Sequence, residues 1–114
     1  MDPVREPGSA SEGREAAARW TFFTNHFLVL LAVAGDPDLR VRDIADRVGV
    51  TERATQAILS DLVADGYVER IRIGRRNRYK IRRSAGFRHL LTTGTTVGEV
   101  IDVVVGHYAE RAVG

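Results

Sequence analysis

Two short runs of alternating apolar and polar residues, separated by a turn signal, constrain the fold of this chain most. The first run, residues 67–73, reads Tyr-Val-Glu-Arg-Ile-Arg-Ile, the second, residues 78–82, reads Arg-Tyr-Lys-Ile-Arg, and Gly-Arg-Arg-Asn lies between them at 74–77. Alternation with a period of two predicts strands, and glycine with asparagine between two such runs predicts a hairpin. In it we expect Val68, Ile71 or Ile73, Tyr79 and Ile81 to cover a core on one face, with the arginines on the other face and the tip.

Charge is concentrated on this hairpin. Residues 70–83 contain eight basic side chains and no acidic one. Residues 40–83 together have a net charge of +6, whereas the rest of the chain has −4. A locally basic surface on a nearly neutral protein favours an anionic partner, and nucleic acid is the commonest such partner. A membrane surface is the weaker alternative.

Three helices are predicted before the hairpin. Thr24 is a candidate cap for an apolar helix that runs through Phe27 and Val33 and stops at Gly35-Asp-Pro. Leu39 to Val41 is short enough to be a small strand. Apolar residues at helical spacing then predict a two-turn helix that ends at Val48.

A tight connection to a third helix follows. Gly49 suits a left-handed end of one helix, and Thr51 offers a hydroxyl cap to the next. This third helix is expected from Glu52 to about Asp65, with Gly66 closing it. Its inward side chains are expected to be Thr55, Ile58, Leu59 and Leu62.

The C-terminal segment reads as a connector and an amphipathic helix. Thr96-Val-Gly-Glu99 matches a capping box, and a stripe of aliphatic residues follows it. The stripe can close the chain's own core or extend a core across a two-fold axis, and dimerisation is the favoured role. The candidate dimer contacts are Trp20, Phe22, Phe23, Val97, Val100, Ile101, Val104, Val105 and Tyr108.

These elements predict three regions. Residues 1–14 are expected to be a disordered tail, because they carry Pro, Gly and Ser with few apolar side chains. Residues 15–83 form one mostly helical α+β domain with three helices and a small β-hairpin. Residues 84–114 are the connector and the C-terminal helix.

A short helix, a glycine turn, a second helix with a polar outer face and a basic hairpin resemble the winged helix-turn-helix of MarR-like and ArsR-like bacterial transcription regulators. The run Asp-Leu-Val-Ala-Asp-Gly-Tyr-Val, residues 61–68, is similar to the helix-to-wing junction of those families. The resemblance covers residues 24–82. It implies a three-helix core with a wing, a recognition helix at 51–65 in the major groove, and a wing at 67–82 on the backbone or in the minor groove.

Carried over by position, the resemblance implies two sets of contacts with double-stranded DNA. The recognition set can read bases, with Arg53 suited to guanine, Gln56 to adenine and Ala57 to a thymine methyl group, while Glu52 is expected to pair with a neighbouring arginine. This set comprises Thr51, Glu52, Arg53, Gln56, Ala57 and Ser60. The second set contacts phosphates, with Asn77 also setting the turn of the hairpin. It comprises Arg40, Arg42, Arg72, Arg75, Arg76, Asn77, Arg78 and Lys80.

Other functions are disfavoured. The chain contains no cysteine, which excludes disulfides and thiolate zinc sites, and its three histidines lie in separate segments. We predict no metal, no cofactor and no enzyme activity, because no nucleophile–base pair or phosphate-binding glycine loop can be assembled. No long apolar stretch or signal peptide is evident, so a cytoplasmic location is expected. Whether a small-molecule effector exists is left open.

The sequence therefore predicts a homodimeric, sequence-specific DNA-binding transcription regulator. A winged helix that binds a protein partner or RNA remains the alternative, because the same fold serves in both roles. The eight basic residues favour DNA, because eight uncompensated positive charges repel one another and cost stability unless an anion is bound.

Overall fold

Helix α2, Asn25–Gly35, begins where Thr24 caps it: the Thr24 hydroxyl accepts a hydrogen bond from the backbone N–H of Phe27 at 3.2 Å. The computed structural model describes residues 21–113, with side chains described as far as residue 106. The expected tail at residues 1–14 lies outside this range. Helix α2 buries Val29, Leu30 and Val33, so its central turn forms the middle of the core.

The two helices of the predicted helix-turn-helix are α3, Val41–Val48, and α4, Glu52–Ala64. Gly49 ends α3 with a left-handed φ of 89°, a conformation that glycine adopts without steric cost. Thr51 caps α4 by accepting from the backbone N–H of Ala54 at 3.0 Å. The small strand expected at residues 39–41 is wrong, because Leu39 is buried in a loop and Val41 already starts α3.

The hairpin consists of β1, Val68–Ile73, and β2, Arg76–Ile81, paired antiparallel. Its turn is Gly74-Arg75, with Gly74 at a φ of 62°, as the first position of a type II′ turn requires. Asn77 does not set the turn: it lies opposite Arg72 within the ladder.

The core face of the hairpin also differs from the expectation. Because Val68 pairs with Ile81 and Arg70 with Tyr79, the face that covers the core carries Val68, Tyr79 and Ile81. Ile71 and Ile73 lie on the opposite face and are exposed. Residues three or five positions apart in a strand cannot share a face, so neither isoleucine can join Val68.

A connector with a short 3-10 helix, η1 (Leu90–Thr92), leads to α5, Val97–Val113. The predicted capping box is formed: the Thr96 N–H donates to Glu99 Oε1 at 2.9 Å, and the Glu99 N–H donates to Thr96 Oγ1 at 3.2 Å. Two backbone bonds join the start of α5 to the end of the hairpin, from Val97 N–H to Ala85 O at 2.8 Å and from Gly98 N–H to Arg83 O at 2.9 Å.

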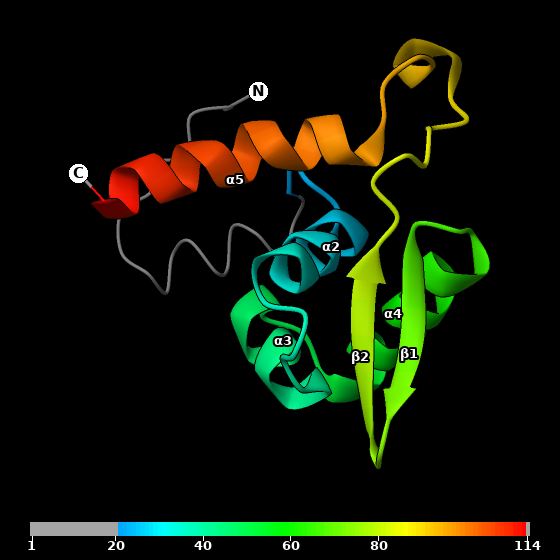
Figure 1. Cartoon of the computed structure of the whole chain (residues 1–114), viewed down its shortest axis with the longest axis vertical. Helices are drawn as coiled ribbons and strands as arrows, with labels where there is room; N and C mark the ends of the chain where they lie inside the picture. The colour runs from blue at the N-terminus through cyan, green and yellow to red at the C-terminus, as the bar shows by residue number, and fades with distance from the viewer. Residues whose placement is uncertain (1–20, 114) are drawn as a thin grey trace.

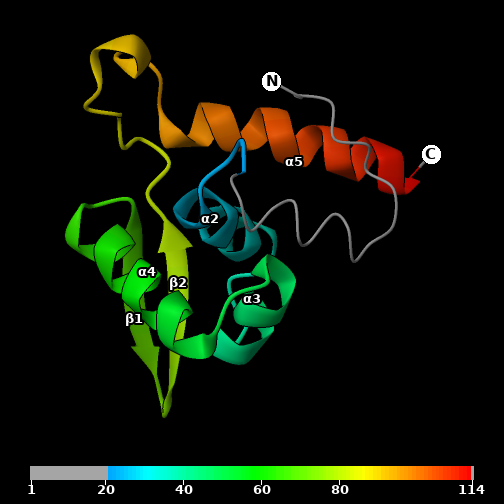
Figure 2. The same ribbon diagram turned by 180° about the vertical axis from the view of Figure 1, so that it is seen from behind.

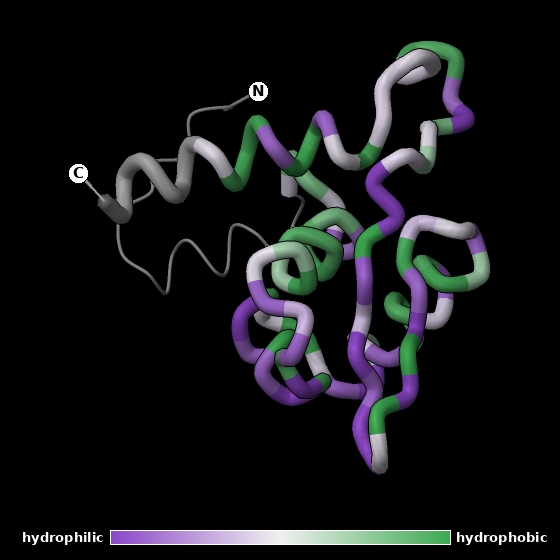
Figure 3. Tube along the Cα trace, viewed as in Figure 1, coloured by the Kyte–Doolittle hydropathy of each residue, from purple (hydrophilic) through white to green (hydrophobic). Residues whose placement is uncertain are grey.

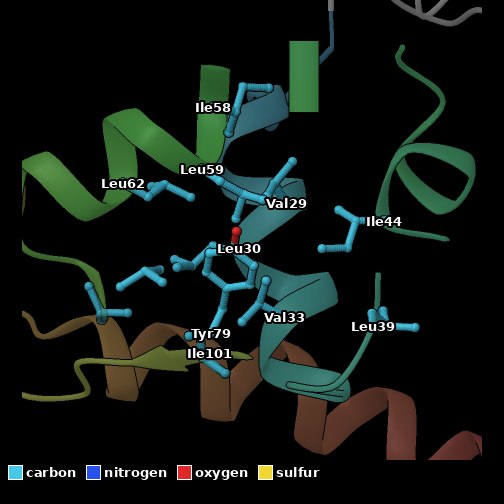
Figure 4. Close-up of a cluster of buried hydrophobic side chains, with 12 residues drawn as sticks. Val29, Leu30, Val33, Leu39, Ile44, Ile58, Leu59, Leu62, Tyr79 and Ile101 are labelled. Carbon is cyan, nitrogen blue, oxygen red and sulfur yellow. The ribbon is translucent and has the colours of Figure 1, made fainter. Parts of the chain in front are cut away.

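The core is formed by side chains from every major element (Figure 4). Helix α2 lies at its centre, with α3, α4, the hairpin and α5 around it. The buried cluster comprises Val29, Leu30, Val33, Leu39, Ile44, Ile58, Leu59, Leu62, Val68, Tyr79, Val97 and Ile101. The four inward positions predicted for α4, including Thr55, are all buried.

The start of α4 and the tip of the hairpin lie toward one end of the molecule, and α5 lies at the other (Figures 1 and 2). Four described helices and a two-stranded antiparallel hairpin confirm the predicted α+β winged helix. The hairpin tip and the start of α4 thus lie at the opposite end of the molecule from α5.

Candidate nucleic-acid interface

The outer face of α4 presents the six side chains expected to read bases. Burial of Thr55, Ile58, Leu59 and Leu62 against the core turns the opposite side of the helix to solvent. Thr51, Glu52, Arg53, Gln56, Ala57 and Ser60 are all exposed. Four of them, Arg53, Gln56, Ala57 and Ser60, follow the spacing i, i+3, i+4 and i+7, so they lie along one helical stripe.

Glu52 departs from its expected role. Among residues 21–106, no arginine lies within ion-pair distance of its carboxylate. The predicted pair of Glu52 with Arg53 or another arginine is therefore not formed within this range. Instead the carboxylate lies in the first turn of α4, where the partial positive charge of the helix N-terminus stabilises a negative side chain.

Basic side chains of the hairpin lie on both of its faces. Arg70 and Arg72 are on the side of the ladder that carries Tyr79, and the Arg70 guanidinium lies 5.7 Å from the centroid of the Tyr79 ring. Arg72 donates from Nε to the carbonyl of Gly74 at 3.0 Å, which fixes its direction at the turn. On the outer face, Arg76 and Arg78 lie opposite the exposed Ile73 and Ile71, and Lys80 lies opposite Glu69. The arginines therefore do not share one face, contrary to the prediction.

The loop before α3 contacts two arginines of the wing, Arg76 and Arg78, through Asp38. Asp38 accepts from Arg76 Nη2 through its main-chain carbonyl at 2.6 Å, and its carboxylate pairs with Arg78 Nε at 3.2 Å. The backbone N–H of Tyr79 also donates to the carbonyl of Pro37 at 3.4 Å. The loop thus runs along the free edge of β2, and this arrangement was missed from the sequence, where Asp36-Pro37-Asp38 indicated only the end of a helix.

Ion pairs reduce the positive charge of the hairpin. Three of the eight basic residues between 70 and 83 have a carboxylate partner: Arg78 with Asp38, Arg82 with Glu69 at 3.8 Å, and Arg83 with Asp102 at 2.7 Å. All these pairs are solvent-exposed. The cluster is therefore partly compensated, and the assumption of eight uncompensated charges is wrong.

Several further basic side chains, in and around α3, α4 and the hairpin, form no ion pair within the described part of the chain. Arg40, Arg42, Arg53, Arg75 and Lys80 are exposed and have no acidic partner within the described side chains. Figure 3 shows hydrophilic residues concentrated on α3 and the hairpin, while α2 is mainly hydrophobic. All eight residues expected to contact phosphates are exposed.

The candidate dimer contacts divide into two groups. Val97 and Ile101 are buried in the chain's own core, so these two side chains serve core closure, one of the two roles left open for the stripe. Val100, Val104 and Val105 are half-buried. Phe22 is exposed and Phe23 is partly exposed. Trp20 and the Tyr108 side chain lie outside the described residues.

Val103, on α5, is an exposed residue that was not among the predicted dimer contacts. Val103 is 61% exposed, on the side of α5 that faces away from the buried Ile101. Its position could have been found by extending the helical period from Ile101, because a residue two positions along a helix points roughly to the opposite side.

Other chemistry is limited in the described part of the chain. The described side chains, residues 21–106, hold no group of three His, Asp or Glu placed to bind a metal ion. His26 instead pairs with Asp61 at 2.9 Å, and His89 accepts from the N–H of Leu91 through Nδ1. None of the helices in this range is long and apolar enough to cross a membrane.

Comparison with known families gives a match over the winged helix. The sequence model of the MarR family matches residues 24–78, which extend from the cap of α2 into β2. No curated protein matches the chain significantly.

Proposed function

We propose that this chain, a DNA-binding transcription regulator whose residues 24–78 are a winged helix of the MarR family, recognises double-stranded DNA by sequence, with α4 in the major groove. One observation carries this proposal: the exposed polar face of α4 and the basic hairpin lie toward the same end of the molecule (Figure 2). A helix of this kind fits a groove about 12 Å wide.

We assign base recognition to the exposed stripe on α4, which comprises Arg53, Gln56, Ala57 and Ser60. Arg53 is suited to paired hydrogen bonds with guanine and Gln56 to paired hydrogen bonds with adenine. Ala57 contributes apolar contact with a thymine methyl group. Thr51 has a structural role as the cap of α4, so its hydroxyl is already engaged.

Affinity is supplied mainly by the cations around this stripe. Arg40, Arg42, Arg75 and Lys80 contact phosphates, as do Arg72, Arg76 and Arg78, whose side chains are already oriented by neighbouring main-chain or carboxylate groups. Such contacts release counterions, so binding weakens steeply with salt but carries little direct sequence information.

The protein acts as a homodimer in this proposal. The family match supports it, and one winged helix reads too few base pairs for high specificity. The available surface comprises Phe22, Phe23 and the exposed side of α5 around Val103. Two wings would then address half-sites about one helical turn apart. We assign the chain no catalytic activity and no cofactor.

Selection of bound duplexes from a random pool tests sequence recognition and symmetry together. The expected result is an enriched palindromic site. Enrichment of no sequence would contradict base reading by α4, and displacement of the duplex by single-stranded RNA or an acidic protein at moderate salt would favour the alternative function.

The role of the wing is tested separately. Arg75→Ala should weaken duplex binding and reduce its dependence on salt. Arg88→Ala is a matched control, since Arg88 lies in the connector and pairs with Asp65 at 3.5 Å. Equal effects of the two substitutions would show that only overall charge matters.

A further inference from the structure

The Asp38 carboxylate, in the loop before α3, forms an ion pair with a cation of the wing. It contacts Arg78 through Nε at 3.2 Å, which leaves the terminal amino groups of the guanidinium for another anion. Both side chains are about half exposed, at 47% for Arg78 and 63% for Asp38. A phosphate approaching the hairpin therefore meets Arg78 together with a nearby negative charge.

The surroundings of this pair are otherwise cationic. A cavity of about 300 Å³ between the start of α3 and β2 is lined by Arg40 and Arg76 together with Leu39, Val41, Asn77 and Tyr79. Arg76 also donates to the main-chain carbonyl of Asp38. An anion at this junction would be attracted by Arg40, Arg76 and Arg78 and repelled by the carboxylates of Asp38 and Asp36.

Main-chain groups hold the loop and β2 together without the carboxylate. The Tyr79 N–H bonds the carbonyl of Pro37, and Arg76 bonds the carbonyl of Asp38. The Asp38 N–H is in turn capped by the Asp36 side chain at 3.0 Å. The charge of Asp38 is thus not required to place the wing, and an exposed ion pair adds little stability.

We propose that the Asp38 carboxylate competes with DNA phosphates for Arg78 and holds the affinity of the wing for DNA below the level that its arginines allow. This inference rests on the proposed function. A carboxylate close to a bound phosphate costs Coulomb energy whenever DNA binds. The Asp38 carboxylate thus occupies part of Arg78, a side chain that would otherwise be free to contact phosphate.

The substitution Asp38→Asn tests this directly, because asparagine removes the charge and keeps both the main-chain carbonyl and a side-chain oxygen. Duplex binding should tighten about threefold to tenfold at low salt. The slope of log K against log salt should steepen by up to about 0.9, the contribution of one additional phosphate contact. A purely structural role for Asp38 predicts unchanged or weaker binding instead.

Asp102→Asn is the matched control. It makes the same change in net charge and also releases an arginine, Arg83, from an exposed pair at 2.7 Å, but at the α5 end of the hairpin. Its effect on affinity should be clearly smaller than that of Asp38→Asn. Equal effects would overturn the inference, because overall charge would then explain both.

A double-mutant cycle identifies the competing cation. In an Arg78→Gln background, Asp38→Asn should lose most of its effect, since no guanidinium remains to be released. An undiminished gain in that background would overturn the assignment to Arg78. If the wild-type protein binds duplex DNA with strong salt dependence but Asp38→Asn does not tighten binding, the inference fails and the proposed function stands. Absence of duplex binding by the wild type would remove both.

Discussion

Gly98, in the first turn of α5, lies so close to Arg83 at the end of the hairpin that a Cβ on the glycine would be 3.0 Å from both the Cβ and the carbonyl oxygen of Arg83. Its N–H donates to that same carbonyl. A side chain here would force two backbone segments apart. We therefore expect Gly98→Ala to lower the free energy of unfolding by about 1–2 kcal/mol, although alanine is ordinarily the better helix former.

Gly106 provides the control in the same helix. No other element of the described chain comes within 4 Å of a Cβ at this position, so Gly106→Ala should raise the unfolding free energy by up to about 1 kcal/mol. Urea denaturation of both variants measures the difference. Stabilisation by Gly98→Ala would show that the contact with Arg83 is not tight.

Thr51 stabilises the start of α4 through its side-chain hydroxyl. Thr51→Ala should cost about 1 kcal/mol of stability and weaken duplex binding, because the first turn of the recognition helix loses its cap. Thr51→Ser retains the hydroxyl and should remain close to wild type in both measurements. If the serine variant binds DNA as weakly as the alanine variant, the threonine methyl group rather than the cap matters for DNA.

Substitutions at Gln56 and Lys80 should separate the sequence specificity of DNA binding from its affinity. We expect Gln56→Ala to reduce discrimination at one position of the preferred site by about 1–3 kcal/mol and to leave the salt slope unchanged. Lys80→Ala should instead weaken binding to all duplexes alike and reduce the salt slope by about 0.9. Binding measured on matched and mismatched duplexes at several salt concentrations tests both. A change of site preference in the lysine variant would contradict its assignment to the backbone.

Val103 tests the proposed dimer. Because this side chain is largely exposed on α5, Val103→Asp should leave the fold stable while shifting the protein toward monomer in sedimentation experiments. Thr93→Asp, at an exposed position of the connector, introduces the same charge outside α5 and should leave the oligomeric state unchanged. Identical sedimentation of both variants and the wild type would place the dimer contact elsewhere.

Local signals in the sequence predicted most of the fold. Thr24, Thr51 and the Thr96–Glu99 pair predicted three helix starts because capping depends on residues only three positions apart. Gly49 and Gly66 predicted two helix ends because their positive φ values are a local property. The four buried positions of α4 followed from its helical period.

The errors have different physical causes. Grouping Ile71 or Ile73 with Val68 ignored the parity of a strand, since positions separated by an odd number point to opposite faces. The turn was placed over four residues, whereas Gly74 alone supplies the positive φ that a two-residue connection needs. Choosing between such registers depends on which cross-strand pairs can reach the core, as Val68 and Ile81 do.

Long-range pairing of charges was beyond the sequence. Asp38 meets Arg76 and Arg78 across about forty residues of chain, and the Asp36-Pro37-Asp38 run also indicates an ordinary helix stop. The burial of Val97 and Ile101 likewise depends on how α5 rests on α2. These relationships arise from tertiary packing, which local patterns do not specify.

The two backbone hydrogen bonds that join residues 97 and 98 to residues 85 and 83 make the end of the hairpin and the start of α5 a single corner of the molecule. The intervening loop, which includes η1, is bypassed by this junction. In a dimer formed through α5, the spacing between the two wings would be set at this corner and not by the length of the loop. Insertions and deletions between residues 88 and 93 could therefore accumulate during evolution without changing the distance between the two wings of such a dimer.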